Sequence, residues 1–311
     1  MPEQTPISKI AIVGAGLVGQ GWAIVFARAG KKVTIFDEKT NAQDTINAQI
    51  NQAVQDLANG GLCADPKTIL SNISYAETLQ DAVASSDYVQ ESTFERIDVK
   101  RSVSREIDAV LQPHAFVGSS TSGFPGSEFY QDCDSRERMM VVHPVNPPHL
   151  VPIVEIVPTQ WTNPAFAVAA RNLMDEVKQS PVSLSREIPG FVLNRLQGAL
   201  LDEAFALLEE GYASAEDIDR TVRDGLGLRW AFMGPFETID LNAPKGLADY
   251  SQRLAPMYSG FAAQRHSNRD WTDRAVQRAD AECRMAHSLE DLENRRSWRD
   301  SMLMRILKAK M

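Results

Sequence analysis

The stretch KIAIVGAGLVGQGWAIVFARAGKKVTIFD, residues 9–37, decides how the first half of this chain folds. It opens with a run of apolar and β-branched residues at 9–13, which is typical of a buried strand. An amphipathic stretch at 22–29 predicts a helix that ends at Gly30, and residues 32–36 predict a second strand. A strand, a helix and a strand within about 30 residues form a βαβ unit with two parallel strands.

The loop between the first strand and the helix carries the spacing G-x-G-x-x-G. Glycines at this spacing allow a tight turn, a close approach of the backbone to a pyrophosphate, and close packing of the helix on the strand. The helix N-terminus then directs its free N–H groups at the phosphates. The loop is therefore expected to bind a dinucleotide through Gly14, Gly16, Leu17, Val18 and Gly19.

Asp37 ends the second strand, 18 residues after Gly19. A carboxylate at this place binds the 2′-hydroxyl of a ribose and repels a 2′-phosphate. Glu38 reinforces that repulsion, and Lys39 weakens it slightly. The predicted cofactor is therefore NAD rather than NADP. The alternative for Asp37 is an ordinary solvated turn residue.

Strand and helix patterns continue to alternate as far as residue 185. Residues 40–80 are polar and mostly helical in pattern, with a break at 59–61. Further strands are predicted at 86–92, 115–118, 139–142, 151–157 and 181–185, and helices at 96–111, near Pro125 and at 164–178. The alternation predicts a doubly wound sheet of the Rossmann type, which binds ligands at the carboxyl ends of its strands. Polar and glycine residues lie at such ends, namely Gly14, Asp37, Glu91, Ser119 to Ser122 and His143.

The second half of the chain is helical in pattern. We expect an α/β domain over residues 1–187 and an all-helical domain over 188–311 that binds substrate and forms a homodimer. Such an arrangement leaves a cleft between the two domains. Helices are predicted at 190–211 and 214–227, the second with a capping box from Ser214 to Asp217, and breaks near Pro235, Pro244 and Pro256.

Composition excludes several classes of protein. The chain has 311 residues, of which 43% are hydrophobic and 23% charged, and its net charge of -9 argues against nucleic acid as a partner. No apolar run approaches the roughly 20 residues that span a membrane, and the first residues carry no signal-peptide core. Three widely spaced cysteines, Cys63, Cys133 and Cys283, form no metal pattern and indicate reduced thiols in a cytoplasm.

The stretch VVHPVNPPHL, residues 141–150, places a histidine between an apolar run and three prolines. Since proline cannot continue a sheet, the strand is expected to stop before His143. The next strand holds a carboxylate, Glu155, in an otherwise apolar run, which is unfavourable without a partner. Pairing the two residues gives a general base and the group that orients it. The alternative is a purely structural hydrogen bond away from any substrate.

Ser122 and Asn194 are candidates for binding the substrate oxygen. Ser122 follows the strand at 115–118, and Asn194 lies about one turn into the first helix of the second domain. Either side chain can donate a hydrogen bond to a carbonyl oxygen as it forms. Serine in a turn and asparagine near a helix start are also common without any function.

The motifs VGAGLVGQGWA (13–23), HPVNPP (143–148) and EIPGFVLNR (187–195) resemble those of the 3-hydroxyacyl-CoA dehydrogenase family. GLGLRWAFMGPFET (225–238), LNA (241–243) and SWRDSMLMR (297–305) are similar to its lambda-crystallin and L-gulonate 3-dehydrogenase branch. The resemblance covers nearly the whole chain. It implies that His143 is the general base, Glu155 its partner, Ser122, Asn194 and Asn146 substrate-binding residues, and Asp37, Glu95 and Lys100 cofactor-binding residues.

The chain departs from the family pattern in two places. The family's Ser-Asn-Thr-Ser turn reads Ser-Ser-Thr-Ser at 119–122, as in the crystallin branch, and Asp240 stands where the gulonate enzymes tend to have histidine, with Pro244-Lys245 just after. If this last segment lines the pocket, the natural substrate differs from L-gulonate.

A free carboxylate is favoured over a coenzyme A thioester as substrate. Coenzyme A carries several phosphate charges, yet residues 40–66 contain no Lys or Arg. Arg229 can clamp a small carboxylate with two hydrogen bonds, or can pair with Asp217 or Asp219 instead. The prediction is NAD-dependent oxidation of a 3-hydroxy acid, with L-gulonate as the leading substrate. The alternatives are an L-3-hydroxyacyl-CoA or L-carnitine substrate, and an NAD-binding structural protein without turnover.

Overall fold

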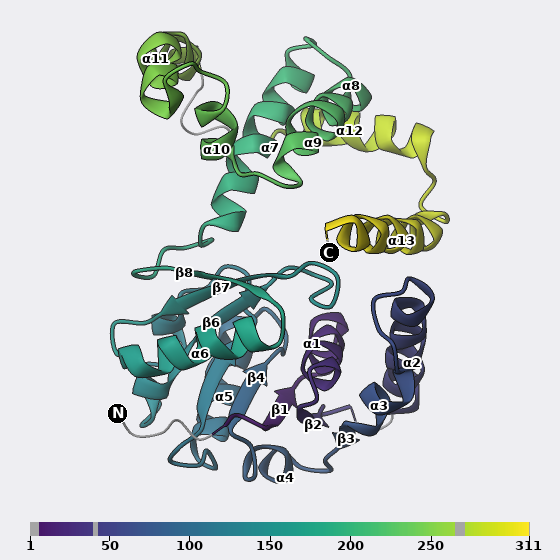
Figure 1. Cartoon of the computed structure of the whole chain (residues 1–311), viewed down its shortest axis with the longest axis vertical. Helices are drawn as coiled ribbons and strands as arrows, with labels where there is room; N and C mark the ends of the chain where they lie inside the picture. The colour runs from purple at the N-terminus through teal and green to yellow at the C-terminus, as the bar shows by residue number, and fades with distance from the viewer. Residues whose placement is uncertain (1–5, 40–42, 265–270, 311) are drawn as a thin grey trace. The chain divides into compact units, whose positions relative to one another are not determined.

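The computed structural model describes residues 6–39, 43–264 and 271–310. It confirms a Rossmann-type sheet followed by helices (Figure 1). Contacts divide the chain into unit 1, which runs to Asn194 and also takes in Asp300–Ala309, and unit 2, Arg195–Arg299. The last strand ends at Ser183 and the next helix begins at Leu193, so the change to helical structure brackets the boundary expected at residues 187 and 188.

Unit 1 is built on an eight-stranded sheet in the order β3-β2-β1-β4-β5-β6-β7-β8. Neighbouring strands are parallel throughout, except that β6 and β7 are antiparallel. The strands are β1 Lys9–Val13, β2 Lys32–Phe36, β3 Ile73–Tyr75, β4 Tyr88–Glu91, β5 Phe116–Ser119, β6 Met139–Pro144, β7 Ile153–Pro158 and β8 Ser180–Ser183.

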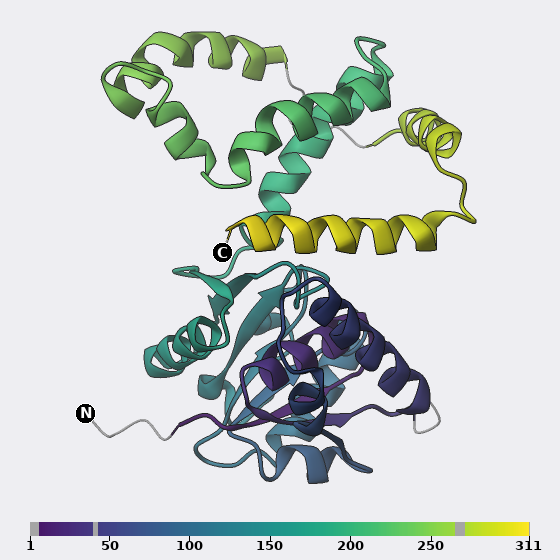
Figure 2. The same ribbon diagram turned by 45° about the vertical axis from the view of Figure 1, so that its right-hand side comes forward.

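Helices cover both faces of this sheet (Figures 1 and 2). They are α1 Leu17–Arg28, α2 Gln43–Asn59, α3 Pro66–Ser71, α4 Leu79–Val83, α5 Ile97–Asp108 and α6 Pro164–Glu176. Ile10 and Ile12 of β1 pack with α1, α2, α3 and α6 in one core, whereas Ala11 and Val13 pack with α4 and α5 in the other. Alternate residues of a strand point to opposite faces, so both faces must be apolar, and the run at 9–13 was recognisable for that reason.

Three local differences from the predicted elements have simple causes. β3 was not expected, because a three-residue edge strand inside a polar stretch leaves almost no pattern. The helix near Pro125 is only a single 3-10 turn, Gly126–Glu128, and a second such turn covers Arg136–Arg138. β6 runs through His143 and Pro144 rather than stopping at residue 142. Pro144 is tolerated because it is the terminal residue of the strand.

The described residues of the second half form helices and one π-helical segment. They are α7 Leu193–Glu209, α8 Ala215–Arg220, the π-helix η4 Thr221–Leu226, α9 Gly227–Trp230, α10 Pro235–Asp240, α11 Gly246–Gln264, α12 Asp273–Ala286 and α13 Leu292–Lys310. Ser214 caps α8 by accepting a hydrogen bond from the N–H of Asp217, as predicted. None of the helices in the described ranges combines the length and the apolar character that a bilayer crossing requires.

The break expected near Pro256 was wrong, because Pro256 lies inside α11. Proline removes one hydrogen bond from a helix, but its fixed φ is helical. The carbonyl that loses its partner is that of Gln252, four residues earlier, and Gln252 is exposed, so water can reach it. Pro235 begins α10, and Pro244 lies in the connection to α11, as predicted.

Candidate active site

The glycine-rich loop has the geometry that a pyrophosphate requires. Gly14 has a φ of 97°, and a Cβ atom there would lie 2.6 Å from the carbonyl oxygen of Ser92. A Cβ on Gly19 would lie 1.9 Å from the carbonyl oxygen of Gly14, so α1 packs directly on the loop. Gly16 is the N-cap of α1 and has no side chain to occupy the helix N-terminus. The free N–H groups there are open to an anion.

Asp37 lies beside this loop at the end of β2. One carboxylate oxygen accepts a hydrogen bond from the N–H of Ala15 at 2.7 Å, and the other accepts from the N–H of Lys39 at 2.9 Å. Each oxygen keeps a lone pair for a ribose hydroxyl. A pocket opens between the loop and the segment after β4, and its lining includes Gly14, Gly16, Asp37, Glu38, Thr93 and Phe94. The residues fit an adenosine group with a free 2′-hydroxyl.

Leu17 and Val18, the other two residues of this loop predicted to bind the cofactor, belong to helix α1. Leu17 is the first residue of α1 and is exposed. Val18 packs against the apolar core beneath the helix. Neither side chain lines the pocket beside Asp37.

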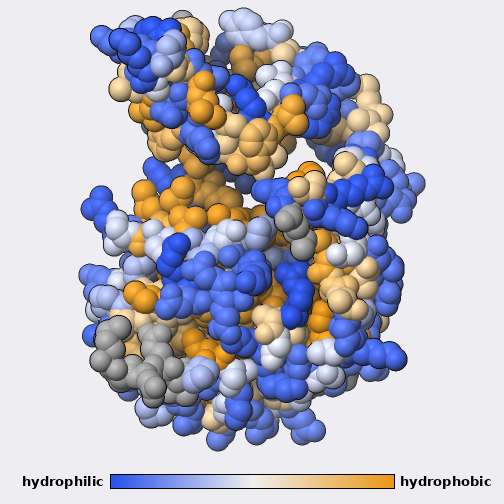
Figure 3. All heavy atoms as spheres, viewed as in Figure 1, coloured by the Kyte–Doolittle hydropathy of each residue, from blue (hydrophilic) through white to orange (hydrophobic). Residues whose placement is uncertain are grey.

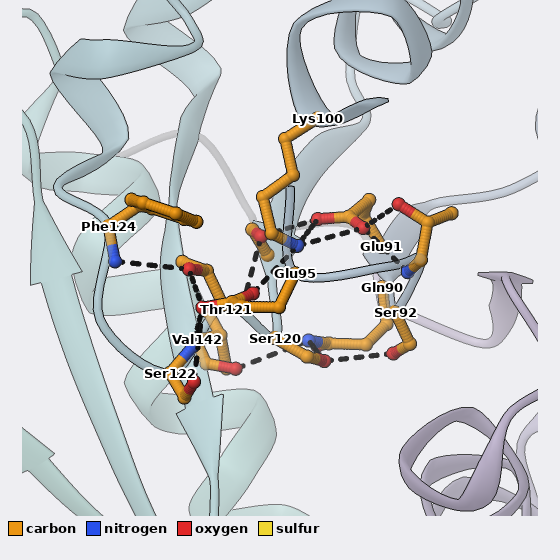
Figure 4. A network of polar contacts seen from close by, with 12 residues as sticks. Gln90, Glu91, Ser92, Glu95, Lys100, Ser120, Thr121, Ser122, Phe124 and Val142 are labelled. Atoms are coloured by element: carbon orange, nitrogen blue, oxygen red, sulfur yellow. Dashed lines mark hydrogen bonds and ion pairs between the residues drawn. The ribbon is translucent and has the colours of Figure 1, made fainter. Parts of the chain in front are cut away.

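A buried ion-pair cluster lies at the carboxyl end of β4 (Figure 4). The ammonium of Lys100 is 3.1 Å from one carboxylate oxygen of Glu91 and 3.2 Å from the other, and both side chains are 1% exposed. Lys100 also pairs with Glu95 at 3.4 Å. Glu91 accepts further hydrogen bonds from the N–H and hydroxyl of Thr93 and from the Ser119 hydroxyl.

Each of the four hydroxyl groups in the turn at 119–122 makes a hydrogen bond within the protein. Ser119 donates to Glu91. The Ser120 hydroxyl contacts Gln90, Ser92 and Trp22, and this serine is one of the departures from the family pattern. The side chains of Thr121 and Ser122 both donate to Glu95. Figure 4 shows Thr121 and Ser122 directed at Glu95, and Ser120 directed at Gln90 and Ser92.

Glu95 accepts four hydrogen bonds on one oxygen. The donors are the Thr121 hydroxyl at 2.8 Å, the N–H and hydroxyl of Ser122 at 2.8 and 3.0 Å, and the N–H of Gly123 at 3.3 Å. Partial burial by itself raises the pKa of Glu95, but the hydrogen bonds and the charge of Lys100 outweigh it, so the pKa lies below its usual value. Glu95 is therefore ionised at neutral pH.

His143 and Glu155 face one another across the antiparallel pair β6 and β7. Nδ1 of His143 is 2.9 Å from a carboxylate oxygen of Glu155, and both residues are buried. The second oxygen of Glu155 accepts from the N–H groups of Val192 and Leu193, at 2.8 and 3.0 Å. Burial alone raises the pKa of Glu155, yet these hydrogen bonds bring it below the usual value. The carboxylate fixes the His143 tautomer with the proton on Nδ1, which leaves Nε2 as a base.

The chain between β8 and α7 closes over this pair. Gly190 and Phe191 both have positive φ, of 74° and 51°. This conformation is strained for a phenylalanine. It places the fully buried Phe191 ring 5.4 Å from the His143 ring and directs the following two N–H groups at Glu155. The sequence alone did not indicate a role for Phe191. Its place directly after a glycine and before the candidate Asn194 was the available signal.

Asn194 reaches Ser122 within unit 1. Its side-chain amide donates to the backbone carbonyl of Ser122 at 2.5 Å, and the second N–H of that amide is not used by this contact. Asn194 is the second residue of α7, rather than one turn into it as predicted. Asn146 is exposed in the loop after β6. The structure thus links the Ser122 turn, the start of α7 and the His143 pair.

Two other predicted residues lie in unit 2. Arg229 is exposed in α9, directly after the π-helix, and has no ion pair within the described ranges. Asp217, its expected alternative partner, pairs with Arg220. Asp240 makes a local contact: its carboxylate accepts a hydrogen bond from the N–H of Leu247, at the start of α11, at 2.7 Å. The Asp240 carboxylate therefore has a structural role within this unit.

Known proteins match this chain over most of its length. Residues 9–188 match the model of the NAD binding domain of 3-hydroxyacyl-CoA dehydrogenase, and residues 190–282 match that of its C-terminal domain. Lambda-crystallin of Oryctolagus cuniculus is 36% identical over 97% of this chain and 96% of its own length. L-carnitine dehydrogenase of Streptomyces coelicolor is 34% identical over 91% of this chain and 86% of its own length.

Solved structures agree with these matches. The structure of 5-formyl-3-hydroxy-2-methylpyridine 4-carboxylic acid 5-dehydrogenase, an NAD⁺-dependent dismutase, has a TM-score of 0.84, is 26% identical and covers 98% of both chains. The structure of 3-hydroxybutyryl-CoA dehydrogenase from Escherichia coli has a TM-score of 0.68 and is 26% identical, covering 85% of this chain and 54% of that one. Of these two solved structures, one is named for a carboxylic acid and the other for a CoA thioester.

Proposed function

The chain belongs to the 3-hydroxyacyl-CoA dehydrogenase family of NAD-dependent enzymes, and from this premise we propose that it oxidises the 3-hydroxyl of a small free carboxylic acid. L-Gulonate is the leading substrate. The buried pair of His143 and Glu155 at 2.9 Å carries the proposal, because it supplies a base at the edge of the sheet where the cofactor site lies. NAD, when bound, supplies the hydride acceptor.

His143 acts as the general base in this proposal. Its Nδ1–H is held by Glu155, so the lone pair on Nε2 takes the proton of the substrate hydroxyl. The cation that forms on the ring is then stabilised by the ionised Glu155 at hydrogen-bond distance. Glu155 is itself held by two backbone N–H groups at the start of α7 and so cannot rotate away easily.

Asn194 and Ser122 bind the substrate oxygen in this proposal. The amide of Asn194 has one N–H beyond the one donated to the Ser122 carbonyl, and that N–H can stabilise the oxygen as it becomes a carbonyl. Ser122 is exposed at the end of β5. Asn146 lies in the exposed loop that follows His143 and is proposed to line the same site.

Charge favours a free acid over a CoA thioester. Helix α2 carries no lysine or arginine, and it is the element after β2 where coenzyme A phosphates would need basic partners. Arg229, exposed and without an ion pair within the described residues, is proposed to bind the substrate carboxylate. The similarity to an L-carnitine dehydrogenase favours the second candidate, L-carnitine, which is also a free 3-hydroxy acid.

The test is NADH formation by purified protein with NAD and each of L-gulonate, L-carnitine, L-3-hydroxybutyrate and L-3-hydroxybutyryl-CoA. We expect turnover of a free acid and little of the thioester. Arg229→Met should raise the KM for that acid at least tenfold, while Arg223→Met, which removes an exposed and already paired arginine six residues earlier, should not. Turnover of the thioester alone contradicts the proposal.

The same assay addresses the non-enzymatic alternative. If the protein only binds NAD, we expect a tight NADH complex, no turnover of any of the four compounds, and NADH binding that does not depend on pH near the pKa of a histidine.

We further propose that the enzyme is a cytoplasmic homodimer. The free thiols of Cys63, Cys133 and Cys283 support a reducing compartment.

A further inference from the structure

Three polar side chains meet at the hydroxyl of Ser120. Trp22 lies in α1, Gln90 in β4, and Ser92 and Ser120 directly after β4 and β5. The Ser120 hydroxyl oxygen is 3.1 Å from Nε1 of Trp22, 2.8 Å from Nε2 of Gln90 and 2.8 Å from the hydroxyl oxygen of Ser92. Figure 4 shows Ser120 in contact with both Gln90 and Ser92. Because a hydroxyl has two lone pairs and one hydrogen, these three contacts use everything that Ser120 has.

The orientation of the Gln90 amide is fixed by its other neighbours. Its Nε2 is 3.2 Å from the backbone carbonyl oxygen of Val142, which can only accept a hydrogen bond. Its Oε1 accepts from the hydroxyl of the buried Tyr88. Turning the amide over would place its oxygen against the Val142 carbonyl oxygen, with no hydrogen between them. Gln90 therefore donates to Ser120 and does not accept from it.

The hydrogen of Ser120 must therefore point at Ser92. The indole N–H of Trp22 can only donate, so Trp22 and Gln90 occupy both lone pairs of the Ser120 oxygen. The acceptor for the one hydrogen of Ser120 is then the Ser92 oxygen at 2.8 Å. Ser92 cannot direct its own hydrogen back at Ser120, and the Ser92 hydroxyl has no second hydrogen bond within the described residues.

Ser92 lies in the wall of the predicted cofactor pocket. It is half-buried and lines the pocket together with Gly14 and Asp37. Its backbone also packs on the glycine loop, since a Cβ atom on Gly14 would lie 2.6 Å from the Ser92 carbonyl oxygen. The oxygens of a pyrophosphate are hydrogen-bond acceptors and those of a ribose can accept as well. A hydroxyl hydrogen without an acceptor at this place suits a bound dinucleotide.

We propose that Ser92 donates a hydrogen bond to an oxygen of bound NAD, and that Ser120, Gln90 and Trp22 are positioning residues that direct its hydrogen there. The inference concerns cofactor binding, so it holds whichever 3-hydroxy acid the enzyme oxidises. It also gives a role to Ser120, the residue at which the turn departs from the family pattern.

The test is the NADH Kd of purified protein, measured by fluorescence titration without substrate. Ser92→Ala should raise the Kd by about tenfold, the contribution of one hydrogen bond. Ser92→Cys keeps the size of the side chain but has only a weak S–H donor, so it should lose most of the same affinity. The control is Ser71→Ala, at an exposed serine that ends α3 outside the pocket, and its Kd should stay within about twofold of the wild type. An unchanged Kd in both Ser92 variants overturns the inference.

A double-mutant cycle tests whether Ser120 acts through Ser92. Ser120→Ala should raise the NADH Kd by about threefold to tenfold, because the Ser92 hydroxyl then rotates freely. In the Ser92→Ala background the same change should cost less than about twofold. Equal effects in both backgrounds overturn the positioning role.

Trp22→Phe gives a second cycle, since Ser120→Ala leaves two buried donors without an acceptor and lowers stability. It frees one lone pair of Ser120, so that Ser92 can turn its hydrogen back, and it should weaken NADH binding only where Ser92 is present. The same loss in the Ser92→Ala background also overturns the positioning role. If the wild type oxidises none of the four compounds, the proposed function fails, and the titrations still decide this inference.

Discussion

At the scale of single residues, the site depends on two carboxylates that are each saturated by donors. Glu155 accepts from a histidine and two backbone N–H groups, and Glu95 accepts from four groups of one turn. Both pKa values lie below the usual range despite burial, which by itself would raise them. Both groups are therefore charged at neutral pH, and each holds a neighbour that we propose to contact the substrate.

The first prediction concerns His143. His143→Gln removes the base and should lower kcat by roughly a hundredfold to ten-thousandfold, the usual contribution of a general base. The NADH Kd should not change, because His143 does not line the pocket beside Asp37. Steady-state kinetics and NADH fluorescence titration measure the two quantities. His114→Gln is the matched control, since His114 is an exposed histidine that pairs with Asp87 away from the site. Undiminished turnover by His143→Gln contradicts the mechanism.

The second prediction concerns stability against pH at Glu155. Its pKa in the folded protein is lowered, so its contribution to the free energy of unfolding is present above the pKa in the unfolded chain, about 4.3. That contribution is lost as the pH falls through the lower pKa of the folded state. Urea unfolding of the wild type and of Glu155→Gln should therefore differ most near neutral pH. The difference should narrow as the pH falls below about 4, and a difference that stays constant into acid contradicts this reading.

At the scale of elements, the ends of β4, β5, β6 and β7 bring the polar groups together. The parallel strands β4 and β5 place Glu91 opposite Ser119, and the antiparallel pair β6 and β7 places His143 opposite Glu155. The start of α7 then supplies the N–H groups for Glu155 and the amide of Asn194. A change in the register of any one strand would separate these pairs, because neighbouring residues of a strand face opposite sides of the sheet.

The third prediction concerns the ion pair that joins α5 to β4. Lys100→Met leaves the buried Glu91 without its cation and should lower the free energy of unfolding by about 3–5 kcal/mol. Adding Glu91→Gln should restore part of that loss, because the remaining carboxamide carries no charge. Chemical denaturation measures both. The control Lys67→Met, at an exposed lysine, should stay within about 0.5 kcal/mol of the wild type, and an equally small effect of Lys100→Met would refute the idea that this pair stabilises the sheet.

At the scale of the whole molecule, unit 2 exposes several large apolar side chains. Tyr212, Phe232, Phe236, Leu241 and Met285 are between 66% and 81% exposed. Figure 3 shows apolar side chains at the surface over the helices of this unit. Several large apolar side chains exposed on one unit are typical of a surface that binds another protein. A second copy of the chain is the partner we propose.

The fourth prediction follows from that surface. Analytical ultracentrifugation at micromolar concentration should give twice the mass of the 311-residue chain. Phe232→Glu combined with Phe236→Glu should shift the equilibrium towards the monomer, because a dimer interface would have to bury the added charges. Asp224→Asn, an exposed change in the same unit, should have no such effect. A wild-type protein that sediments as a monomer contradicts the proposal.

The sequence by itself determined the Rossmann-type order of strands and helices and the glycine loop between the first strand and helix. It also placed the Asp37 carboxylate after the second strand and so predicted NAD as the cofactor, which the family match confirms. It also predicted the pairing of His143 with Glu155, because a carboxylate in an apolar strand needs a partner nearby. These features depend on local pattern. An apolar run, a glycine spacing or a charge inside a strand can be recognised from adjacent residues, because its physical cause lies within the same short segment.

Only the tertiary structure decided the rest. The four donors on Glu95, the burial of Lys100 between two carboxylates and the Phe191 ring against His143 join residues from 5 to 48 positions apart. The antiparallel course of β7, the extension of β6 through Pro144 and the passage of α11 through Pro256 also depend on tertiary context. No local pattern specifies such contacts, because the free energy that favours them comes from groups that meet only after the sheet has formed.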